Sequence, residues 1–190
     1  MTAVRPEPLI TTEAIAARVG EIAAEIDRDY AGEEEILILG VLRGAYMFLA
    51  DLSRRLTVPR RVDFIALSSY DKANSTGSVR LIMDTRVSLA GRHVLIVEDI
   101  LDSGRTLAYL LRLFGARGPA SLKTCVLVRK PNPEVLVEVD YLGFDIPDEW
   151  VVGYGLDYDD RYRALPYIGT LDPEAVEAAT RGGTAAGGGG

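Results

Sequence analysis

Apolar positions near the N-terminus recur with the period of an α-helix. Over residues 12 to 30 they come every three or four positions on an alanine-rich background, with polar residues between them. Such spacing places the apolar side chains along one face, which predicts an amphipathic helix. Thr11 or Thr12 precedes the pattern and can serve as the N-cap. The apolar positions are Ile15, Val19, Ile22 and Ile26.

The middle of the chain alternates between strand and helix patterns. The run "ILILGVL" at residues 36 to 42 is apolar on both faces, as in a central strand of a parallel sheet. Helical spacing follows at 45 to 56 and again at 105 to 118, where glycine ends the pattern. Further strands are predicted at 62 to 70, 79 to 84, 93 to 98 and 121 to 130. This alternation predicts an α/β protein with an open, mainly parallel sheet flanked by helices.

The C-terminal third lacks these regular patterns. Residues 139 to 170 are rich in aromatic residues and glycine without a long helical pattern, which predicts a small lobe attached to the sheet. Residues 180 to 190 are glycine-rich and of low complexity, so we expect them to be disordered. A length of 190 residues suits one hydrophobic core, and residues 1 to 175 are predicted to form a single domain.

Composition and charge narrow the class of protein. With 48% hydrophobic and 26% charged residues, the chain has an ordinary globular composition. A net charge of -7 argues against nucleic acid as a partner, although "SRRLTVPRR" at 53 to 61 can form a local basic surface. Cys125 is the single cysteine, which excludes a disulfide framework or a cysteine-rich metal site. No signal peptide or membrane-spanning run is recognisable, so we expect a cytoplasmic protein without a membrane partner.

Residues 93 to 107, "HVLIVEDILDSGRTL", combine acids with groups that hold an anion. The predicted strand ends in Glu98 and Asp99, and Asp102 follows. In a parallel sheet, ligands bind where strands lead into helix N-termini, and this segment occupies that position. Small and hydroxyl-bearing residues at a helix start can cradle a phosphate, whereas carboxylates suit sugar hydroxyls or Mg²⁺. The cradle residues are Ser103, Gly104, Arg105 and Thr106, and together with the acids they predict a site for a phosphorylated sugar.

Other interpretations of this segment explain less. A strand ending in paired acids also begins response-regulator receiver domains, but here it lies mid-chain and is followed by a phosphate cradle. An acidic surface turn leaves the coincidence of acids and anion-binding residues unexplained. No GxxxxGK[ST] pattern and no GxGxxG after a strand is present, so nucleoside triphosphate and dinucleotide folds lose support. His93 lies at the opposite end of its strand, which disfavours a histidine-based triad.

The segment resembles the phosphoribosyl pyrophosphate signature of type I phosphoribosyltransferases. Its flanks are similar to the hypoxanthine-guanine branch of that family in five motifs that occur in the same order. The signature "VLIVEDILDSGRTL" is one of the five. The other four are "LGVLRGAYMFLADL" as the pyrophosphate loop, "SSYDKANSTG" as a catalytic lid, "LVRKP" as a purine-selecting strand end, and "GFDIPDEWVVGYGLDYDDRYRALPYIG" as a hood. The resemblance covers residues 35 to 170. It implies a type I phosphoribosyltransferase fold with a small hood lobe.

The activity that the resemblance implies is the transfer of a phosphoribosyl group. A nitrogen of hypoxanthine or guanine, which are 6-oxopurine bases, displaces pyrophosphate from phosphoribosyl pyrophosphate. Glu98 and Asp99 are implied to bind the ribose hydroxyls and Mg²⁺, the expected cofactor. Asp102 is implied to exchange a proton with N7 of the purine, which needs a carboxylate partly shielded from water. Ser103, Gly104 and Thr106 are implied to hold the 5′-phosphate, with Arg105 contributing its backbone amide.

Further roles follow from the other motifs. Arg43 and Gly44 correspond to the pyrophosphate loop, in which the peptide before the basic residue is often cis. The family usually has lysine at the position of Arg43. Ser69 and Tyr70 correspond to the lid, for which composition alone equally allows an ordinary strand connection. The segment from 70 to 79 has the composition of a mobile loop.

The resemblance implies that residues in the C-terminal third bind the purine base and a second Mg²⁺. Lys130 would donate to the exocyclic oxygen of the purine, and Arg129 competes for that role. Trp150 would stack on the base, unless this single tryptophan belongs to the core, and Val151 would offer backbone groups. Asp157 is implied to reach a second Mg²⁺, and Arg163 to clamp the pyrophosphate. Tyr158, Asp159, Asp160 and Arg161 are predicted to be surface residues.

The family also suggests a homodimer or homotetramer. An alternative of another class is a nucleic-acid-binding regulator on the same fold that senses phosphoribosyl pyrophosphate, supported by the basic run from Arg54 to Arg61. A regulator needs neither a proton-transfer acid nor a lid, and the chain has candidates for both in Asp102 and in Ser69 with Tyr70. The sequence therefore favours the enzyme.

Overall fold

The computed structural model describes residues 5–69, 79–132, 137–172 and 174. Tyr70, the remainder of the expected lid up to residue 78 and the C-terminal tail lie outside the described residues. Predictions about the closure of the lid and the disorder of the tail therefore stay predictions.

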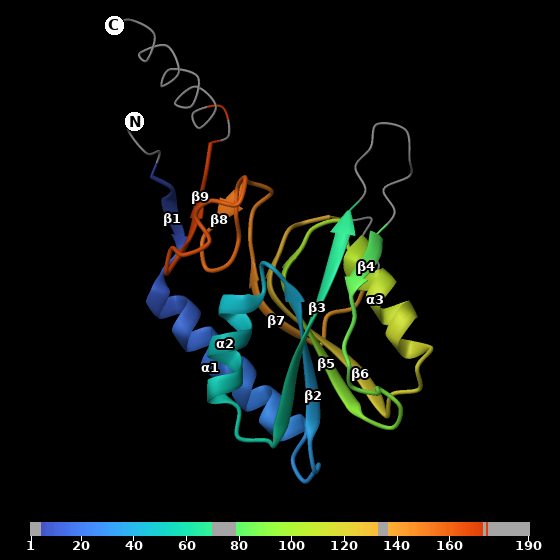
Figure 1. Cartoon of the computed structure of the whole chain (residues 1–190). Helices are drawn as coiled ribbons and strands as arrows, with labels where there is room; N and C mark the ends of the chain where they lie inside the picture. The colour runs from blue at the N-terminus through green and yellow to red at the C-terminus, as the bar shows by residue number, and fades with distance from the viewer. Residues whose placement is uncertain (1–4, 70–78, 133–136, 173, 175–190) are drawn as a thin grey trace, which may run out of the picture.

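The main sheet has six strands within the described residues, in the order β4-β3-β2-β5-β6-β7. All neighbours pair in parallel except β4, which is antiparallel to β3. The predicted open, mainly parallel sheet is thus confirmed (Figure 1). Its strands are β2 (Ile36–Leu42), β3 (Arg60–Ser69), β4 (Val79–Met83), β5 (His93–Leu101), β6 (Ser121–Arg129) and β7 (Tyr141–Asp145).

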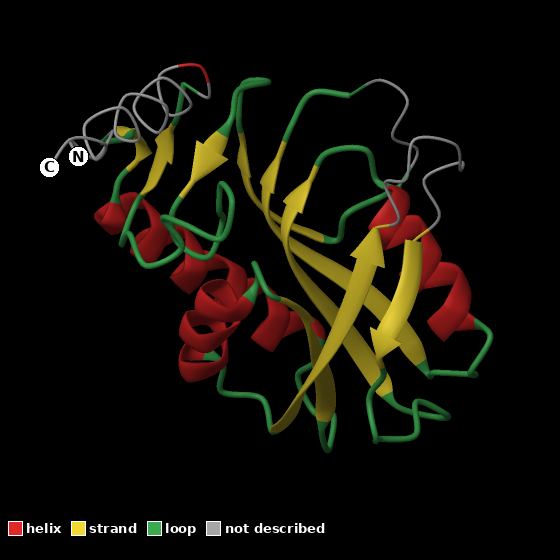
Figure 2. Ribbon diagram, turned by 45° about the horizontal axis from the view of Figure 1, so that its top comes forward, coloured by secondary structure: helices red, strands yellow, loops and turns green. Residues whose placement is uncertain are grey.

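Helices cover both faces of this sheet. Helices α1 (Thr12–Asp29) and α2 (Tyr46–Arg55) lie on one face and α3 (Arg105–Gly115) lies on the other (Figure 2). Thr11 is the N-cap of α1, since its side chain accepts a hydrogen bond from the backbone N–H of Ala14 at 3.2 Å. Among the described residues, no helix is both long and apolar enough to cross a membrane.

A second, smaller sheet forms the hood. It contains β1 (Glu7–Ile10), β9 (Ile168–Thr170) and β8 (Val151–Val152), paired antiparallel in that order. Strand β1 was not predicted, because a four-residue segment containing proline gives no alternation signal and its partner lies at the other end of the chain. The expectation that residues 139 to 170 form the lobe is wrong at its start, because β7 extends the main sheet beside β6.

Strand β5 is longer than predicted. The sequence places its end at Glu98, but pairing with β6 continues through Ile100 and Leu101. The acids are therefore built into the end of the strand, where the backbone ladder fixes their direction.

The site lies where the chain changes direction across the sheet. From β2 the chain crosses by α2 to β3 on one side, and β5 pairs on the other side of β2 before crossing by α3 to β6. The two crossover helices lie on opposite faces, so the carboxyl ends of β2 and β5 diverge into a crevice. Those ends point toward the side of the molecule that carries the hood (Figure 1).

Candidate active site

A cavity of about 250 Å³ opens at the carboxyl ends of β2 and β5. It collects most of the predicted sugar and pyrophosphate residues from three separate parts of the chain. Its lining includes Arg43, Gly44, Glu98, Asp99, Thr106, Asp157 and Arg163, with apolar walls from Val41, Leu42, Leu67 and Val79. Lys130 and Trp150 lie outside this lining.

Glu98 is a buried acid, and one of its carboxylate oxygens has no hydrogen-bond partner among the described residues. Its residue is only 7% exposed, and within the described structure its Oε2 has no hydrogen-bond partner. Burial, together with the charge of neighbouring Asp99, raises the pKa of Glu98 well above its usual value. A buried acid without a donor costs stability, so its presence at the wall of a cavity indicates that a ligand provides its partner.

Asp99 is held directly against the loop that follows β2. Burial raises the pKa of Asp99 to about 6, although its backbone hydrogen bonds and the Arg163 guanidinium act in the opposite direction. A β-carbon at Gly44 would lie 1.6 Å from Oδ2 of Asp99, so only glycine allows this close approach.

The hood in turn packs against the same glycine loop. A β-carbon at Gly155, whose φ is +103°, would lie 2.0 Å from the carbonyl oxygen of Gly44. The Leu42–Arg43 peptide just before this glycine is cis, as the resemblance implies. Gly44 therefore sits between the acid of β5 and the backbone of the hood, without space for a side chain.

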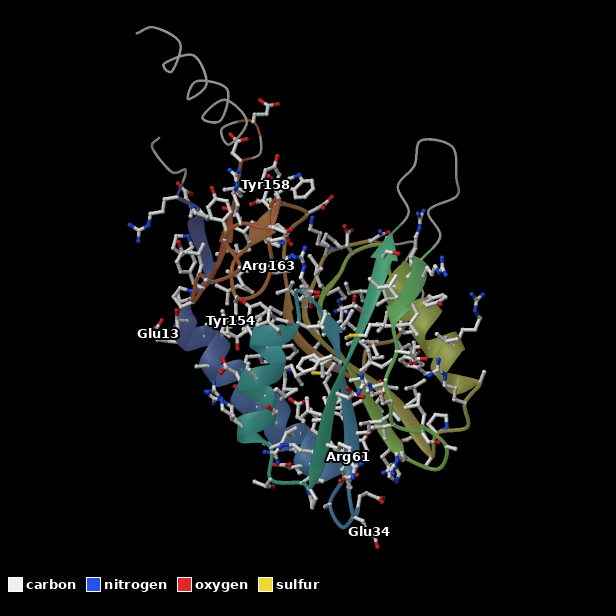
Figure 3. The ribbon with its side chains drawn as sticks, in the orientation of Figure 1. Glu13, Glu34, Arg61, Tyr154, Tyr158 and Arg163 are labelled. Atoms are coloured by element: carbon white, nitrogen blue, oxygen red, sulfur yellow. The ribbon has the colours of Figure 1, made fainter. Side chains whose placement is uncertain are left out.

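Arg163 links the hood to the cavity. Its Nη1 donates to the carbonyl of Gly155 at 2.8 Å, and its Nη2 lies 2.8 Å from Oδ1 of Asp157. The guanidinium is held from two sides and its side chain is only 19% exposed. Figure 3 shows Arg163 between the hood and the main sheet, and Arg61 and Glu34 at the opposite end of the molecule.

Asp160 is exposed, as predicted, and its carboxylate also takes part in this cluster. Its Oδ1 accepts hydrogen bonds from Nη2 of Arg163 at 3.0 Å and from Nη2 of Arg43 at 2.5 Å. Arg163 and then Arg43 lower the pKa of Asp160 below its usual value, so the carboxylate is ionised. One acid thus joins the arginine of the loop after β2 to the arginine of the hood.

The predicted phosphate cradle forms the start of α3. Gly104 is the N-cap with a φ of 70°, a left-handed conformation that favours glycine. Ser103 and Arg105 are exposed, and Thr106 is half-buried at the cavity wall. The free backbone amides of a helix start and two hydroxyl side chains are thus available to an anion.

Asp102 lies just outside the end of β5, with its residue exposed. Its backbone carbonyl accepts a hydrogen bond from Nδ2 of Asn132 at 3.3 Å. The expectation that its carboxylate is partly shielded from water is not met by the described residues. The reason is that Asp102 follows the strand instead of belonging to its paired part.

Lys130 and Trp150 lie close together. Nζ of Lys130 is 5.8 Å from the centre of the Trp150 ring and 3.3 Å from Oδ1 of Asp148. Arg129 points elsewhere and is held by Asp145 through contacts of 2.7 and 3.1 Å. A second cavity, of about 420 Å³, is lined by both basic residues together with Leu101, Pro131, Asn132, Val137, Asp145 and Ile146.

Trp150 is not a core residue. It is 58% exposed, and its ring meets Tyr158 edge-on at 5.9 Å between centroids. The alternative in which the single tryptophan belongs to the core is therefore wrong. Val151, the next residue, is buried in β8.

Comparison with known proteins identifies the family. The family profile described as "Phosphoribosyl transferase domain" matches residues 9–159. The chain belongs to the phosphoribosyltransferase family. This membership accounts for the position of the acids, the glycine loop and the helix start at one crevice.

Relatives of this phosphoribosyltransferase lie in the hypoxanthine-guanine branch. It is 47% identical over 176 residues to the hypoxanthine-guanine phosphoribosyltransferase of Mycobacterium tuberculosis, covering 89% of this chain and 87% of the relative. It is 46% identical over 168 residues to the hypoxanthine phosphoribosyltransferase of Salmonella typhimurium, covering 87% and 94%. The structure of the Trypanosoma cruzi hypoxanthine phosphoribosyltransferase in complex with the product IMP superimposes with a TM-score of 0.82 at 46% identity, covering 88% and 95%.

The carboxylates of this phosphoribosyltransferase fit Mg²⁺ that is shared with a substrate. Within the described residues, no group of three or more His, Cys, Asp or Glu side chains could hold a metal by itself. Mg²⁺ often takes one or two carboxylates and completes its shell with water and phosphate oxygens. The unpartnered Oε2 of Glu98 and the neighbouring Asp99 suit that arrangement, whereas Asp157 is already paired with Arg163.

Ser69 and Tyr70 are placed only in part. Ser69 is the last residue of β3 and pairs with Val79 of β4, so the expected lid begins and ends at the edge of the main sheet. Asn132 and Gly155 were not singled out from the sequence. Gly155 lies in the same segment as Arg163, the expected pyrophosphate arginine, and this is a usable sequence signal. No sequence signal points to Asn132.

Proposed function

We propose that this chain catalyses the Mg²⁺-dependent transfer of the phosphoribosyl group from phosphoribosyl pyrophosphate to hypoxanthine or guanine, a reaction of purine salvage. The products are IMP or GMP and pyrophosphate. The observation that carries the proposal is one cavity lined both by Glu98, whose buried Oε2 has no hydrogen-bond partner among the described residues, and by Arg163. Such a site supplies acids to a sugar and cations to a leaving group.

The sugar phosphate would lie along the end of β5. Glu98 and Asp99 would accept hydrogen bonds from the ribose hydroxyls, because an ionised carboxylate has no donor of its own and seeks one. The amides and hydroxyls from Ser103 to Thr106 would hold the 5′-phosphate at the start of α3.

The pyrophosphate would lie between the glycine loop and the hood. Arg43 and Arg163 provide two guanidinium groups that reach this place from different elements. The backbone of Gly44 can approach the ligand closely, because no side chain stands between them. Mg²⁺, held by Glu98 and Asp99, would neutralise charge on the pyrophosphate oxygens as the bond to C1 breaks.

The purine would lie against Trp150. The exposed indole face suits stacking, and Lys130 beside it can donate to the exocyclic oxygen of a 6-oxopurine. Adenine has an amine at that position, so this contact favours 6-oxopurines. The pairing of Arg129 with Asp145 supports Lys130 over Arg129 for this role. Asp102 would exchange a proton with N7 of the purine as the base attacks the ribose.

The regulator alternative receives less support. Within the basic run, Arg54 pairs with Asp51, and Nε of Arg61 lies 3.5 Å from Oε1 of Glu35. Paired arginines offer less net charge to a phosphate backbone. Arg61 also lies at the end of the molecule opposite to Arg163 (Figure 3). We therefore propose an enzyme without a nucleic-acid partner. We further propose that it acts in the cytoplasm as a homodimer or homotetramer.

A substrate panel tests the proposal. The purified chain is incubated with phosphoribosyl pyrophosphate, Mg²⁺ and one of hypoxanthine, guanine, xanthine or adenine, and the nucleotide product is identified by mass spectrometry. We expect IMP or GMP, no AMP, and no product when a chelator removes Mg²⁺. Absence of both IMP and GMP, or AMP as the main product, contradicts the proposal.

A further inference from the structure

The carboxylate of Asp160 occupies the same two guanidinium groups that the proposed function assigns to pyrophosphate. Its Oδ1 lies 2.5 Å from Nη2 of Arg43 and 3.0 Å from Nη2 of Arg163. A carboxylate oxygen and a phosphate oxygen satisfy a guanidinium through the same kind of charge-assisted hydrogen bond. Asp160 therefore stands in the ligand-free chain where an anionic group is expected in the complex.

The backbone around Asp160 fixes the direction of this carboxylate. Asp159 and Asp160 have φ angles of 51° and 59°, within a tight turn that Tyr158 and Arg161 close through backbone hydrogen bonds of 3.1 and 3.3 Å. The N–H of Asp160 donates to Oδ2 of Asp157 at 2.8 Å. Left-handed conformations are uncommon for residues other than glycine, and aspartate is among those that tolerate them.

Asp159 in the same turn behaves differently. It is one residue away, carries the same charge and also has a positive φ. Its side chain is 79% exposed and reaches Arg161 at 3.8 Å. The chain thus supplies its own comparison, in which two adjacent acids share the turn and one of them joins both cavity arginines.

We propose that Asp160 is an internal counter-ion for the pyrophosphate arginines, displaced when pyrophosphate binds and returning when it leaves. This inference rests on the proposed function, since it concerns the same anion. Without pyrophosphate, the Asp160 carboxylate bridges Arg43 and Arg163. In the complex, it competes with the bound anion and so limits how tightly the product pyrophosphate is held.

The sign of the effect separates this role from a structural one. A residue that only supports the fold weakens ligand binding when it is changed. A competing carboxylate does the opposite, because its loss removes an anion that competes with the ligand for both arginines. Exposed ion pairs of this kind are weak, so we expect the gain in pyrophosphate affinity to be about fivefold at most.

The experiment measures the dissociation constant of Mg²⁺–pyrophosphate by isothermal titration calorimetry. It compares the wild-type chain with Asp160→Asn, Asp160→Glu and the matched control Asp159→Asn. Asparagine keeps the shape and tolerates the positive φ but loses the charge. We expect Asp160→Asn to bind pyrophosphate about three- to fivefold more tightly, Asp160→Glu to stay close to the wild type, and Asp159→Asn to change affinity less than twofold.

Several results would overturn the inference. It is wrong if Asp160→Asn binds pyrophosphate as the wild type does or more weakly, or if Asp159→Asn gains as much affinity. If Asp160→Asn fails to fold, Asp160→Ser is judged by the same criterion. IMP or GMP formation by the wild type is measured in the same preparation, so a wild type that neither forms the nucleotide nor binds pyrophosphate contradicts the proposed function, and with it this inference.

Discussion

At the end of β5, burial acts against two carboxylates that the proposed reaction needs. Glu98 has a raised pKa because of burial and of Asp99, and Asp99 itself has a pKa of about 6 because of burial. The charged form of these acids costs the folded chain stability, because a ligand rather than the protein would provide their partners. The cost depends on pH and can be measured without any substrate.

Asp99→Asn should stabilise the ligand-free chain at alkaline pH. The pKa of Asp99 is raised from 3.8 to about 6 in the folded state, so its favourable contribution is complete below pH 4 and lost as pH rises through 6. We expect the variant to have a higher free energy of unfolding at pH 8, by about 1 to 3 kcal/mol, and no advantage near pH 4. Denaturant unfolding at both pH values checks this, with Asp159→Asn as an exposed control. The same difference at both pH values would contradict it.

Asp102→Asn should separate chemistry from binding. Asparagine preserves the size of the side chain and removes the proton acceptor, so turnover should fall by about 10² to 10⁴. The dissociation constant of phosphoribosyl pyrophosphate should change much less. Steady-state kinetics and calorimetry measure the two quantities. Near-normal turnover would show that Asp102 is not the proton-exchange residue.

Lys130→Met should weaken the binding of the purine base and leave the binding of phosphoribosyl pyrophosphate largely unchanged. Loss of a charged donor to the exocyclic oxygen should raise the KM for hypoxanthine and guanine by about tenfold or more, with little change for phosphoribosyl pyrophosphate. Arg129→Met is the matched control, because Arg129 is held by Asp145. If Arg129→Met gave this pattern and Lys130→Met did not, the assignment of the two basic residues would be reversed.

The positions of site residues could be predicted from the sequence where the residues are close together in the chain. Glu98, Asp99 and the Ser103 to Thr106 cradle lie within one segment, so a strand ending in acids and leading into a helix suffices to place them. The contact between Asp160 and Arg43 joins residues 117 positions apart in the chain, and no local pattern reveals it. The exposure of Asp102 was also not predicted from the sequence. Its carboxylate was expected to be partly shielded from water, whereas the residue is exposed.

At the scale of elements, the sequence predicts the strands that are buried on both faces and the helices with a clear apolar face. Strands β2, β5 and β6 are apolar on both faces, and α1 has a clear apolar stripe, so their positions follow from periodicity. The hood depends instead on pairing between the two ends of the chain, as in Glu7 with Thr170. Its short strands have too few residues for periodicity to show them. The position of the hood rests on glycines that fit against the main domain.

Gly155→Ala should separate the hood from the glycine loop. The added β-carbon would lie 2.0 Å from the carbonyl oxygen of Gly44, at a φ of +103° that alanine rarely adopts. We expect a loss of about 2 to 4 kcal/mol in the free energy of unfolding, together with a loss of activity. Gly115→Ala is the control, because nothing lies within 4 Å of its added carbon and it belongs to α3. Denaturant unfolding compares the two, and equal stability would contradict the proposed packing.

At the scale of the whole molecule, the reaction site is assembled from three parts of the chain. The main sheet supplies acids and a helix start, the loop after β2 supplies Arg43 and Gly44, and the hood supplies Arg163 and Asp157. The hood itself joins the beginning and the end of the described chain, since β1 pairs with β9 (Figure 1). The substrate would thus lie between two sheets, where water can be displaced as the purine enters.

The central claim is that displacement of pyrophosphate is coupled to attack by a purine. Its most direct test is the stoichiometry of pyrophosphate and nucleotide formed by the wild-type chain from phosphoribosyl pyrophosphate and Mg²⁺, with and without hypoxanthine. We expect equal amounts of pyrophosphate and IMP when hypoxanthine is present, and pyrophosphate at no more than the uncatalysed rate when it is absent. Rapid pyrophosphate release without the base, or consumption of hypoxanthine without equal release of pyrophosphate, would contradict it.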